Sequence, residues 1–289
     1  MASMRLAIVF ILVLGTLPWA PALSQVPQAQ AEEQGSKLFN YAFTNEVGFG
    51  RYDVGDQTVQ SIKLPVTYLL QSPVDHKFGI RLRLPVTLAS YNLTLADFLE
   101  DLNLVALSFV PGVEFLIPFG CRWYLIPRQD LGFTKDFEGG DLVLISASGV
   151  RGMYIREFSP VELSLGSGLK YSFGKTSESV NDDDFFLIEA GADLRYPLGF
   201  SVKGHAVDSS VFFIAKHYFR KLVFGQVDEA PIELERLYEV GLSFGTTPRP
   251  KVFGFRIPRI GVSYLFGEDF KGVKISFGFP FKPGPRRQL

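Results

Sequence analysis

The sequence predicts an all-β protein, folded as an antiparallel up-and-down transmembrane β-barrel of about twelve strands. Two observations lead to this fold class: strands in which every second residue is large and apolar, and connections that alternate between short and long. Between Phe78 and Leu88, for example, apolar residues alternate with polar or small ones that include Arg81 and Arg83. Because a strand places successive side chains on opposite faces, we expect lipid on the apolar face and a polar lumen on the other.

The composition narrows the function classes. Of the 289 residues, 47% are hydrophobic and 14% are aromatic, and the formal net charge is −1. So small a net charge gives no electrostatic basis for binding nucleic acid. Cys121 is the single cysteine, so no disulfide can form within the chain.

An export signal is predicted at the N-terminus. Arg5 precedes the apolar run 6–17, and the small residues Ala22 and Ser24 follow it, with a second cleavage position at 29–31. The run is too short to span a bilayer, which takes about 20 residues; an uncleaved anchor is the alternative. No later segment is apolar for long enough to form a membrane helix. We therefore divide the chain into a signal peptide (1–24), a periplasmic N-terminal segment (25–38), the barrel (39–281) and a polar C-terminal tail (282–289).

Twelve segments are predicted to be strands. Seven alternate clearly: 62–70, 78–88, 161–173, 186–196, 238–244, 260–266 and 273–281. Five alternate less clearly: 41–49, 105–115, 119–126, 142–150 and 211–219. Short connections are expected at 71–76, 117–118 and 197–199, and longer ones at 90–102, 128–140, 174–184 and 220–235. An even number of strands leaves both chain ends on the periplasmic side.

The inward face of the predicted barrel carries charges of both signs. Mixed charges allow either an ion-paired, closed lumen or a narrow water path with weak selectivity. Glu189 and Asp193 share a face, but four residues of strand separate them by about 13 Å, too far for a concerted acid–base pair. The residues assigned to the lumen are Arg81, Arg83, Arg122, Glu162, Lys170, Glu189, Asp193, Arg195 and Glu239.

Few side chains could carry catalysis or bind a metal. The histidines are His76, His205 and His217, and segment 204–210 is the one place where His, Asp and Ser occur together. Triad members normally come from separate parts of a fold, so a polar stretch near a strand end is the preferred interpretation. The run 181–184 has the carboxylates of a calcium site without the regular spacing of one. No catalytic, cofactor-binding or metal-binding residue is therefore assigned.

The last predicted strand resembles a known assembly signal. The alternating residues Val273, Ile275, Phe277, Phe279 and Phe281 resemble the C-terminal signal of Gram-negative outer-membrane barrels, although a polar tail follows them. The resemblance implies recognition by the barrel-assembly machinery and contact with outer-membrane lipid and lipopolysaccharide. We expect this strand to close the barrel against the segment 41–49, with all five side chains facing lipid.

Short motifs elsewhere resemble the solitary autotransporter-type β-barrel family, whose members consist of a barrel without a passenger. The motifs are Ile62-Lys-Leu-Pro-Val-Thr-Tyr, Leu82-Arg-Leu-Pro-Val-Thr and Phe109-Val-Pro-Gly-Val-Glu-Phe. The resemblance implies a barrel located in the cell outer membrane, and it assigns no catalytic residue.

Three functions from different classes remain open. The first is a structural or narrow-pore outer-membrane barrel without catalytic activity. The second is an outer-membrane lipid-modifying enzyme centred on His205 or His217. The third is a secreted, soluble β-sandwich that binds a ligand. Fractionation separates the third from the others, and a lipid hydrolysis assay separates the second from the first.

Overall fold

The structure of the chain is a computed structural model. It describes Phe43 and residues 46–55, 57–73, 77–91, 105–137, 140–176, 183–224, 232–247, 251–252, 255–256, 259–277 and 279–281. The predicted signal peptide, N-terminal segment and C-terminal tail lie outside these residues. Within them, no helix is long and apolar enough to cross a membrane.

Fifteen strands account for most of the described residues. Their bounds are β1 Phe49–Val54, β2 Gln57–Gln71, β3 Gly79–Tyr91, β4 Ala106–Phe109, β5 Gly112–Phe119, β6 Trp123–Asp136, β7 Leu142–Phe158, β8 Val161–Thr176, β9 Asp183–Val202, β10 His205–Phe224, β11 Ile232–Thr247, β12 Lys251–Val252, β13 Phe255–Arg256, β14 Ile260–Gly267 and β15 Phe270–Ser276. The short pair β12–β13 forms a separate hairpin, and the other thirteen strands form one antiparallel sheet.

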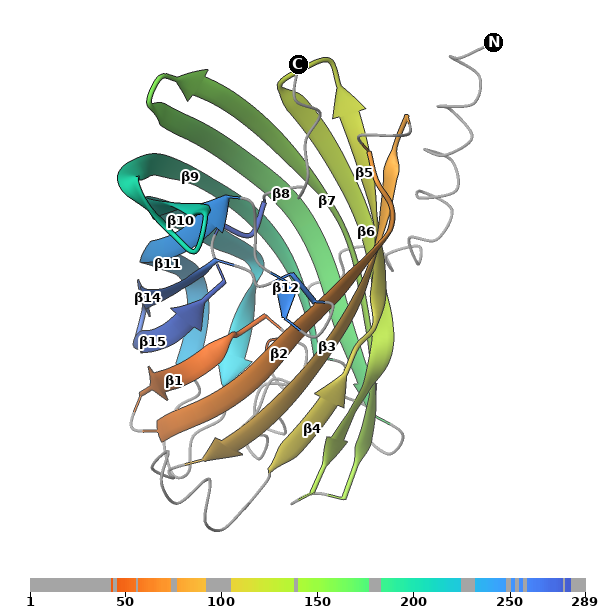
Figure 1. Ribbon diagram of the computed structural model, residues 1–289. Helices are drawn as coiled ribbons and strands as arrows, with labels where there is room; N and C mark the ends of the chain where they lie inside the picture. Colours follow the sequence, from red (N-terminus) through yellow and green to blue (C-terminus); the bar gives the residue numbers. More distant parts are fainter. Residues whose placement is uncertain are drawn as a thin grey trace.

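That sheet closes on itself (Figure 1). Each strand pairs with its neighbours in chain order, and β1 pairs with β15 from Phe49 opposite Ile275 to Val54 opposite Phe270. β4 and β5 occupy a single strand position between β3 and β6, interrupted at Val110. The barrel therefore has twelve strand positions, which confirms the predicted all-β, up-and-down barrel and its strand number.

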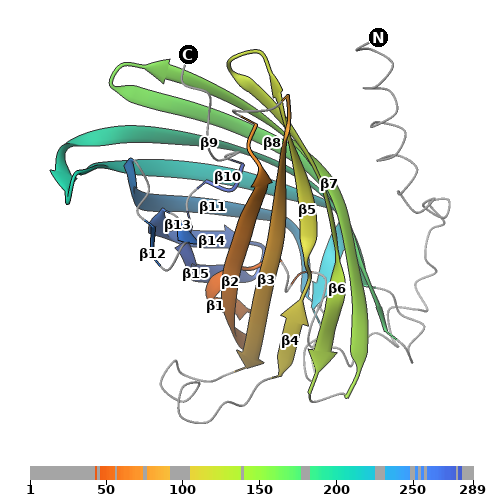
Figure 2. The same ribbon diagram turned by 45° about the vertical axis from the view of Figure 1, so that its right-hand side comes forward.

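The barrel has two rims. We call the end at which β1 begins and β15 ends the terminal rim, and the other end the opposite rim. Tight turns at 120–122, 159–160 and 203–204 lie at the terminal rim, whereas β3 ends and β4 begins at the opposite rim. Figure 2 shows that β1, β14 and β15 are short and that β2 continues well past them towards the terminal rim.

Alternation along the strands determines which side chains face out. At eleven of the twelve strand positions, large apolar side chains are exposed on the outer surface, such as Leu84, Leu165, Phe213 and Val262. The exception is β1, where the outward Arg51 and Asp53 form an exposed ion pair, with Nε and Oδ1 3.6 Å apart. The inward positions carry small, polar and charged residues together with clusters of buried apolar side chains. The prediction of an apolar outer face thus holds nearly all the way round.

The expected strand 41–49 is wrong. Phe43 has helical backbone conformation, and the amides of Glu46 and Val47 both donate to its carbonyl oxygen, at 2.7 and 3.3 Å. The first strand begins only at Phe49. Its side chains alternate as in other strands, but Arg51 and Asp53 take its outward positions, so the apolar pattern that marks the other strands is missing there.

The expected closing strand 273–281 is too long. β15 ends at Ser276, and beyond it the chain turns into the lumen. Phe279 and Phe281 are buried, with exposed fractions of 4% and 0%, whereas Val273, Ile275 and Phe277 are exposed on the outer face. The two last aromatic residues therefore do not face lipid as predicted, because apolar groups inside the barrel offer them an alternative site.

Three connections were also misplaced. Residues 128–140 were expected to be a loop, but β6 runs to Asp136, and Leu131 and Phe133 face outward on it. The turns expected at 117–118 and 197–199 lie further along the chain, at 120–122 and 203–204, where Gly120 and Gly204 have positive φ. β9, β10 and β11 consequently extend past β8 as paired strands, because pairing of β9 with β8 stops at Arg195 while β10 stays paired with both its neighbours.

Candidate functional site

The lumen of the barrel is layered, and the inward residues of β10 show the order. Tyr218 belongs to an apolar cluster near the opposite rim, Lys216 follows in a charged layer, and Ile214 and Phe212 belong to a second apolar cluster nearer the terminal rim. Side chains two residues apart on a strand share a face, so the inward side chains of this one strand pass through all three layers. Residues from other strands join each apolar cluster. We call the apolar cluster that contains Tyr218 the opposite-rim cluster, and the apolar cluster that contains Phe212 and Ile214 the chamber.

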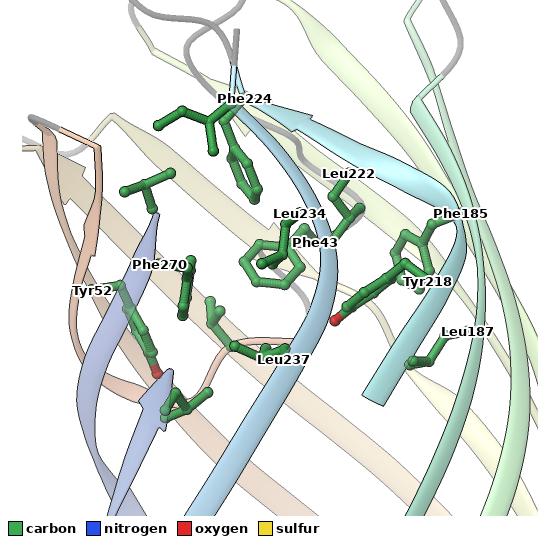
Figure 3. Close-up of a cluster of buried hydrophobic side chains, with 14 residues drawn as sticks. Phe43, Tyr52, Phe185, Leu187, Tyr218, Leu222, Phe224, Leu234, Leu237 and Phe270 are labelled. Carbon is green, nitrogen blue, oxygen red and sulfur yellow. The ribbon is translucent and has the colours of Figure 1, made fainter. Parts of the chain in front are cut away.

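The opposite-rim cluster is built around Phe43, which reaches it from before the first strand (Figure 3). The Phe43 ring meets Phe224, Phe270 and Tyr218 edge to face, with centroids 5.3, 5.8 and 6.4 Å apart. Such pairs of rings pack favourably beyond the area they bury. Phe43 therefore closes this end of the lumen with a side chain that belongs to none of the strands.

The charged layer is centred on Glu114 of β5, which is almost fully buried. Its carboxylate lies 2.5 Å from Nη2 of Arg81, 3.6 Å from Nε of Arg83 and 3.8 Å from Nη1 of Arg151. Arg151 also pairs with Glu189 of β9, 3.2 Å away. One carboxylate thus links three arginines from two strands, and the network continues along the inner wall to β9.

A second branch of the charged layer includes the segment before β1. Arg83 donates from Nη1 to both carboxylate oxygens of Asp130, at 2.9 and 3.0 Å. Arg128 lies 3.8 Å from Asp130 and 3.9 Å from Glu46, and Glu46 also pairs with Lys170 of β8. Buried charges are tolerated only when they are paired, so the layer is stable as a unit.

A separate ion-paired group lies on β9, β10 and the residue before β14. Arg195 and Arg259 both pair with Asp208, which is 5% exposed. Arg259 also donates to Oγ and to the carbonyl oxygen of Ser243, at 3.2 and 3.1 Å. Lys274 and Glu239, 2.9 Å apart, form a further pair near the seam between β1 and β15.

The chamber holds the end of the described chain. Leu116, Ile126, Met153, Ile155, Phe212 and Ile214 pack there with Phe279 and Phe281. The two rings have room because Gly166 of β8 and Gly191 of β9 face each other as register partners. A Cβ atom on Gly166 would lie 2.7 Å from Cβ of Phe281, and one on Gly191 would lie 3.0 Å from Cε2 of Phe279.

Most of the residues assigned to the lumen from the sequence do lie on inward positions. Arg81, Arg83, Lys170, Glu189, Arg195 and Glu239 take part in the ion pairs described above. Asp193 is buried opposite Ser164, and Glu162 lies opposite Arg195. Arg122 does not face the lumen as predicted. It lies exposed in the β5–β6 turn at the terminal rim, because β6 begins only at Trp123.

Sequence reasoning missed the centre of the charged layer. Glu114, Arg128, Asp130, Arg151 and Asp208 were not assigned to the lumen. Alternation with the outward residues of β6 indicates inward positions for Arg128 and Asp130, but the sequence analysis predicts a loop at 128–140. Val211 and Phe213 are exposed on the outer face, and Asp208 stands at an alternate position of the same strand, which indicates an inward side chain.

His76 lies outside the described residues, and neither His205 nor His217 is assembled with a serine and an aspartate within them. His205 lies on the same face of β10 as Val207 and Ser209, whereas Asp208 and Ser210 point inward. His217 is 40% exposed on the outer side, where its Nδ1 lies 3.8 Å from Glu235 and its ring meets Phe219. The arrangement expected of the lipid-modifying alternative is therefore not present at segment 204–210.

No metal site is formed by His, Cys, Asp or Glu side chains within the described part of the chain. Residues 181–182 of the acidic run lie outside it. Asp184 accepts a hydrogen bond from the Tyr171 hydroxyl at 3.1 Å and pairs with Arg220. The ordered chemistry of the lumen is thus ion pairing and apolar packing.

Comparisons with known proteins give structural matches alone. No protein-family model and no curated protein matches the chain. Among solved structures, the translocator domain of autotransporter NalP from Neisseria meningitidis matches with a TM-score of 0.47 and 10% identity, over 78% of this chain and 82% of that chain. The beta domain of the Bordetella autotransporter Brka matches with a TM-score of 0.46 and 10% identity, over 78% of this chain and 91% of that one.

Proposed function

We propose that this chain is an integral outer-membrane β-barrel with a structural or narrow-pore role and no catalytic activity. The observation that carries the proposal is its sidedness: apolar side chains cover the outside at eleven strand positions while ion pairs fill the inside. Soluble proteins rarely expose contiguous apolar patches larger than a few hundred Å². This outer surface is therefore suited to contact with the hydrocarbon core of a bilayer and not to contact with water.

The soluble sandwich alternative does not fit the fold. In a sandwich, the apolar faces of two sheets meet in a core. Here a single sheet closes, and its strand faces are reversed, with Glu114 inside and Leu84 outside. Cell fractionation with heat-modifiable gel mobility tests the proposal: the folded protein should require detergent and migrate differently when unheated. Recovery of native protein in a soluble fraction would overturn it.

The charged layer supports a narrow or closed lumen. Ion pairs connect β3, β5, β6, β7 and β9, and Glu46 adds a terminal segment to them. A conducting path needs sites that ions enter and leave readily, whereas the charged side chains on this side of the lumen are already paired with one another. Planar-bilayer recordings should show small conductance or none, whereas large, stable steps would contradict this role.

We also propose that the barrel-assembly machinery recognises the end of β15, and that lipopolysaccharide and lipid surround the barrel. Val273, Ile275 and Phe277 support this, because they line the outer face where the barrel closes. Deleting residues 282–289 should leave assembly intact, whereas changing Ile275 and Phe277 together to alanine should reduce it. Heat-modifiable mobility in outer-membrane fractions is the measurement, and unchanged assembly of the double variant would count against this signal.

A further inference from the structure

The chamber differs chemically from the rest of the lumen. Buried hydrophobic side chains of β5, β6, β7 and β10 form most of its wall, and Gly166 of β8 and Gly191 of β9 complete it. Arg151 of the adjacent charged layer borders the chamber and is paired with Glu114 and Glu189. The chamber therefore suits an apolar group.

The present occupants of the chamber belong to a segment that is not part of the wall. Phe279 and Phe281 follow the end of β15, and the ring centroids of the two lie 5.0 Å apart. Arg151 donates to the carbonyl oxygen of Pro280 at 3.4 Å, and its guanidinium lies 5.7 Å from the Phe281 ring centroid. The segment can leave the chamber without breaking a strand.

Beside the chamber, β1 is too short to pair with the last part of β2. β1 pairs with β2 from Gly50 opposite Ser61 to Val54 opposite Gln57. From Ile62 to Gln71, β2 pairs with β3 alone among the described residues. All residues of β2 from 64 to 68 are exposed, including Pro65 and Thr67, which alternate with the outward Leu64 and Val66. We call this edge of β2 the portal.

The portal leads directly to the chamber. Leu69 of β2 packs against the chamber cluster, and its sequence neighbours Tyr68 and Leu70 are exposed on the outer face. The apolar outer surface is thus continuous with the apolar interior at this strand. Proline is tolerated at an edge of this kind because it has no N–H to leave unpaired, and Pro65 occupies it.

We propose that the chamber is a binding site for the hydrocarbon chain of a bilayer lipid, which enters through the portal, and that Phe279 and Phe281 occupy the site as an internal stopper. The edge of β2 offers backbone N–H donors to the ester and phosphate oxygens of such a lipid, while the chamber takes its chain. The inference rests on the proposed membrane location and adds a ligand class and a site to it.

Photolabelling from the bilayer tests the proposal. The mature chain is reconstituted in phosphatidylcholine vesicles that carry a diazirine in the middle of one acyl chain, irradiated, and mapped by mass spectrometry. Outward residues such as Tyr154 and Phe213 should be labelled in every variant. Labelling of the inward neighbours Met153 and Phe212 should be weak in the wild type and rise several-fold when Phe279 and Phe281 are both changed to alanine.

Matched controls define the result. Phe266→Ala removes an outward ring of β14 and should leave inward labelling unchanged, and Tyr218 in the opposite-rim cluster should stay unlabelled. Phe281→Leu provides a milder variant if the double alanine variant does not show heat-modifiable mobility, and a rise in inward labelling is expected there too.

Two outcomes overturn the inference. If Met153 and Phe212 stay unlabelled in both stopper variants while Tyr154 and Phe213 are labelled, lipid does not enter and the site is wrong although the membrane location holds. If the outward residues are unlabelled as well, the membrane location itself fails.

Discussion

Gly166 on β8 lies directly beneath the ring of Phe281, so that a Cβ atom added at Gly166 would be 2.7 Å from both Cβ and Cδ2 of that residue. This contact joins the wall of the barrel to a residue five positions beyond the end of its last strand. Gly152 on the neighbouring strand β7 has no such contact, since the nearest atom to its added Cβ would be Ser167 Oγ at 3.6 Å.

The first prediction follows from this difference. Gly166→Ala should reduce the free energy of unfolding by about 1–3 kcal/mol, because an added methyl group overpacks a filled site. Gly152→Ala should change it by less than about 0.5 kcal/mol. Urea titrations in detergent followed by gel mobility give both values. Removing the ring with Phe281→Ala should cancel most of the cost of Gly166→Ala, and fully additive effects would place Phe281 elsewhere.

The second prediction concerns the charged layer. Glu114→Gln should destabilise the barrel by about 3–5 kcal/mol, because it removes the buried carboxylate that Arg81, Arg83 and Arg151 share and leaves their positive charge only partly compensated. Asp53→Asn is the control: its pair with Arg51 is exposed and should contribute about 0–1 kcal/mol. Equal effects of the two substitutions in the same unfolding assay would mean that Glu114 is hydrated and the layer is open.

The third prediction is a pH dependence at the opposite rim. The backbone N–H groups of Glu235 and Arg236 donate to Glu268, at 2.9 and 3.2 Å, and lower the pKa of its carboxyl group below the ordinary value. Because the folded-state pKa is the lower one, the carboxylate stabilises the turn above the unfolded-state pKa of about 4.3. That contribution is lost as the pH falls through the folded-state pKa.

Amide proton shifts in an acid titration measure this effect. The amide signals of Glu235 and Arg236 should move together, with a midpoint below the ordinary carboxyl pKa, and Glu268→Gln should abolish the movement. The amide of Gly55 at the same rim donates to the carbonyl oxygen of Asp269 at 2.9 Å and serves as the control. A midpoint at or above the ordinary pKa would show that the two donors do not bind the carboxylate.

The sequence predicted the wall of the barrel well where alternation was regular. β8 is an example: Leu165 and Leu169 are exposed, and Ser164 and Lys170 are buried, as the period of two requires. Arg81 and Arg83 were placed inward for the same reason. These assignments succeed because the orientation of a strand side chain depends on its own position and not on distant parts of the fold.

Alternation does not predict where the side chains lie just before β1 and just after β15. Phe279 and Phe281 continue the alternation of β15, yet they lie in the chamber. An alternating apolar residue loses its contact with water equally in lipid or in an interior cluster, so the pattern cannot distinguish the two. Phe43 was placed in a strand for the same reason, and its place is set by contacts with β10 and β15.

The central claim is that the outward apolar side chains face lipid and that the opposite-rim cluster inside the barrel is shielded from it. Single tryptophans at two positions of β10 test it most directly, in the chain from residue 25 onward with Trp123→Phe as background: Phe213→Trp faces outward, and Tyr218→Trp replaces a fully buried inward ring. In phosphatidylcholine vesicles brominated on their acyl chains, we predict that the tryptophan at 213 loses most of its fluorescence while that at 218 keeps it. Equal quenching of both, or quenching of neither, would contradict a lipid-embedded barrel with a filled lumen.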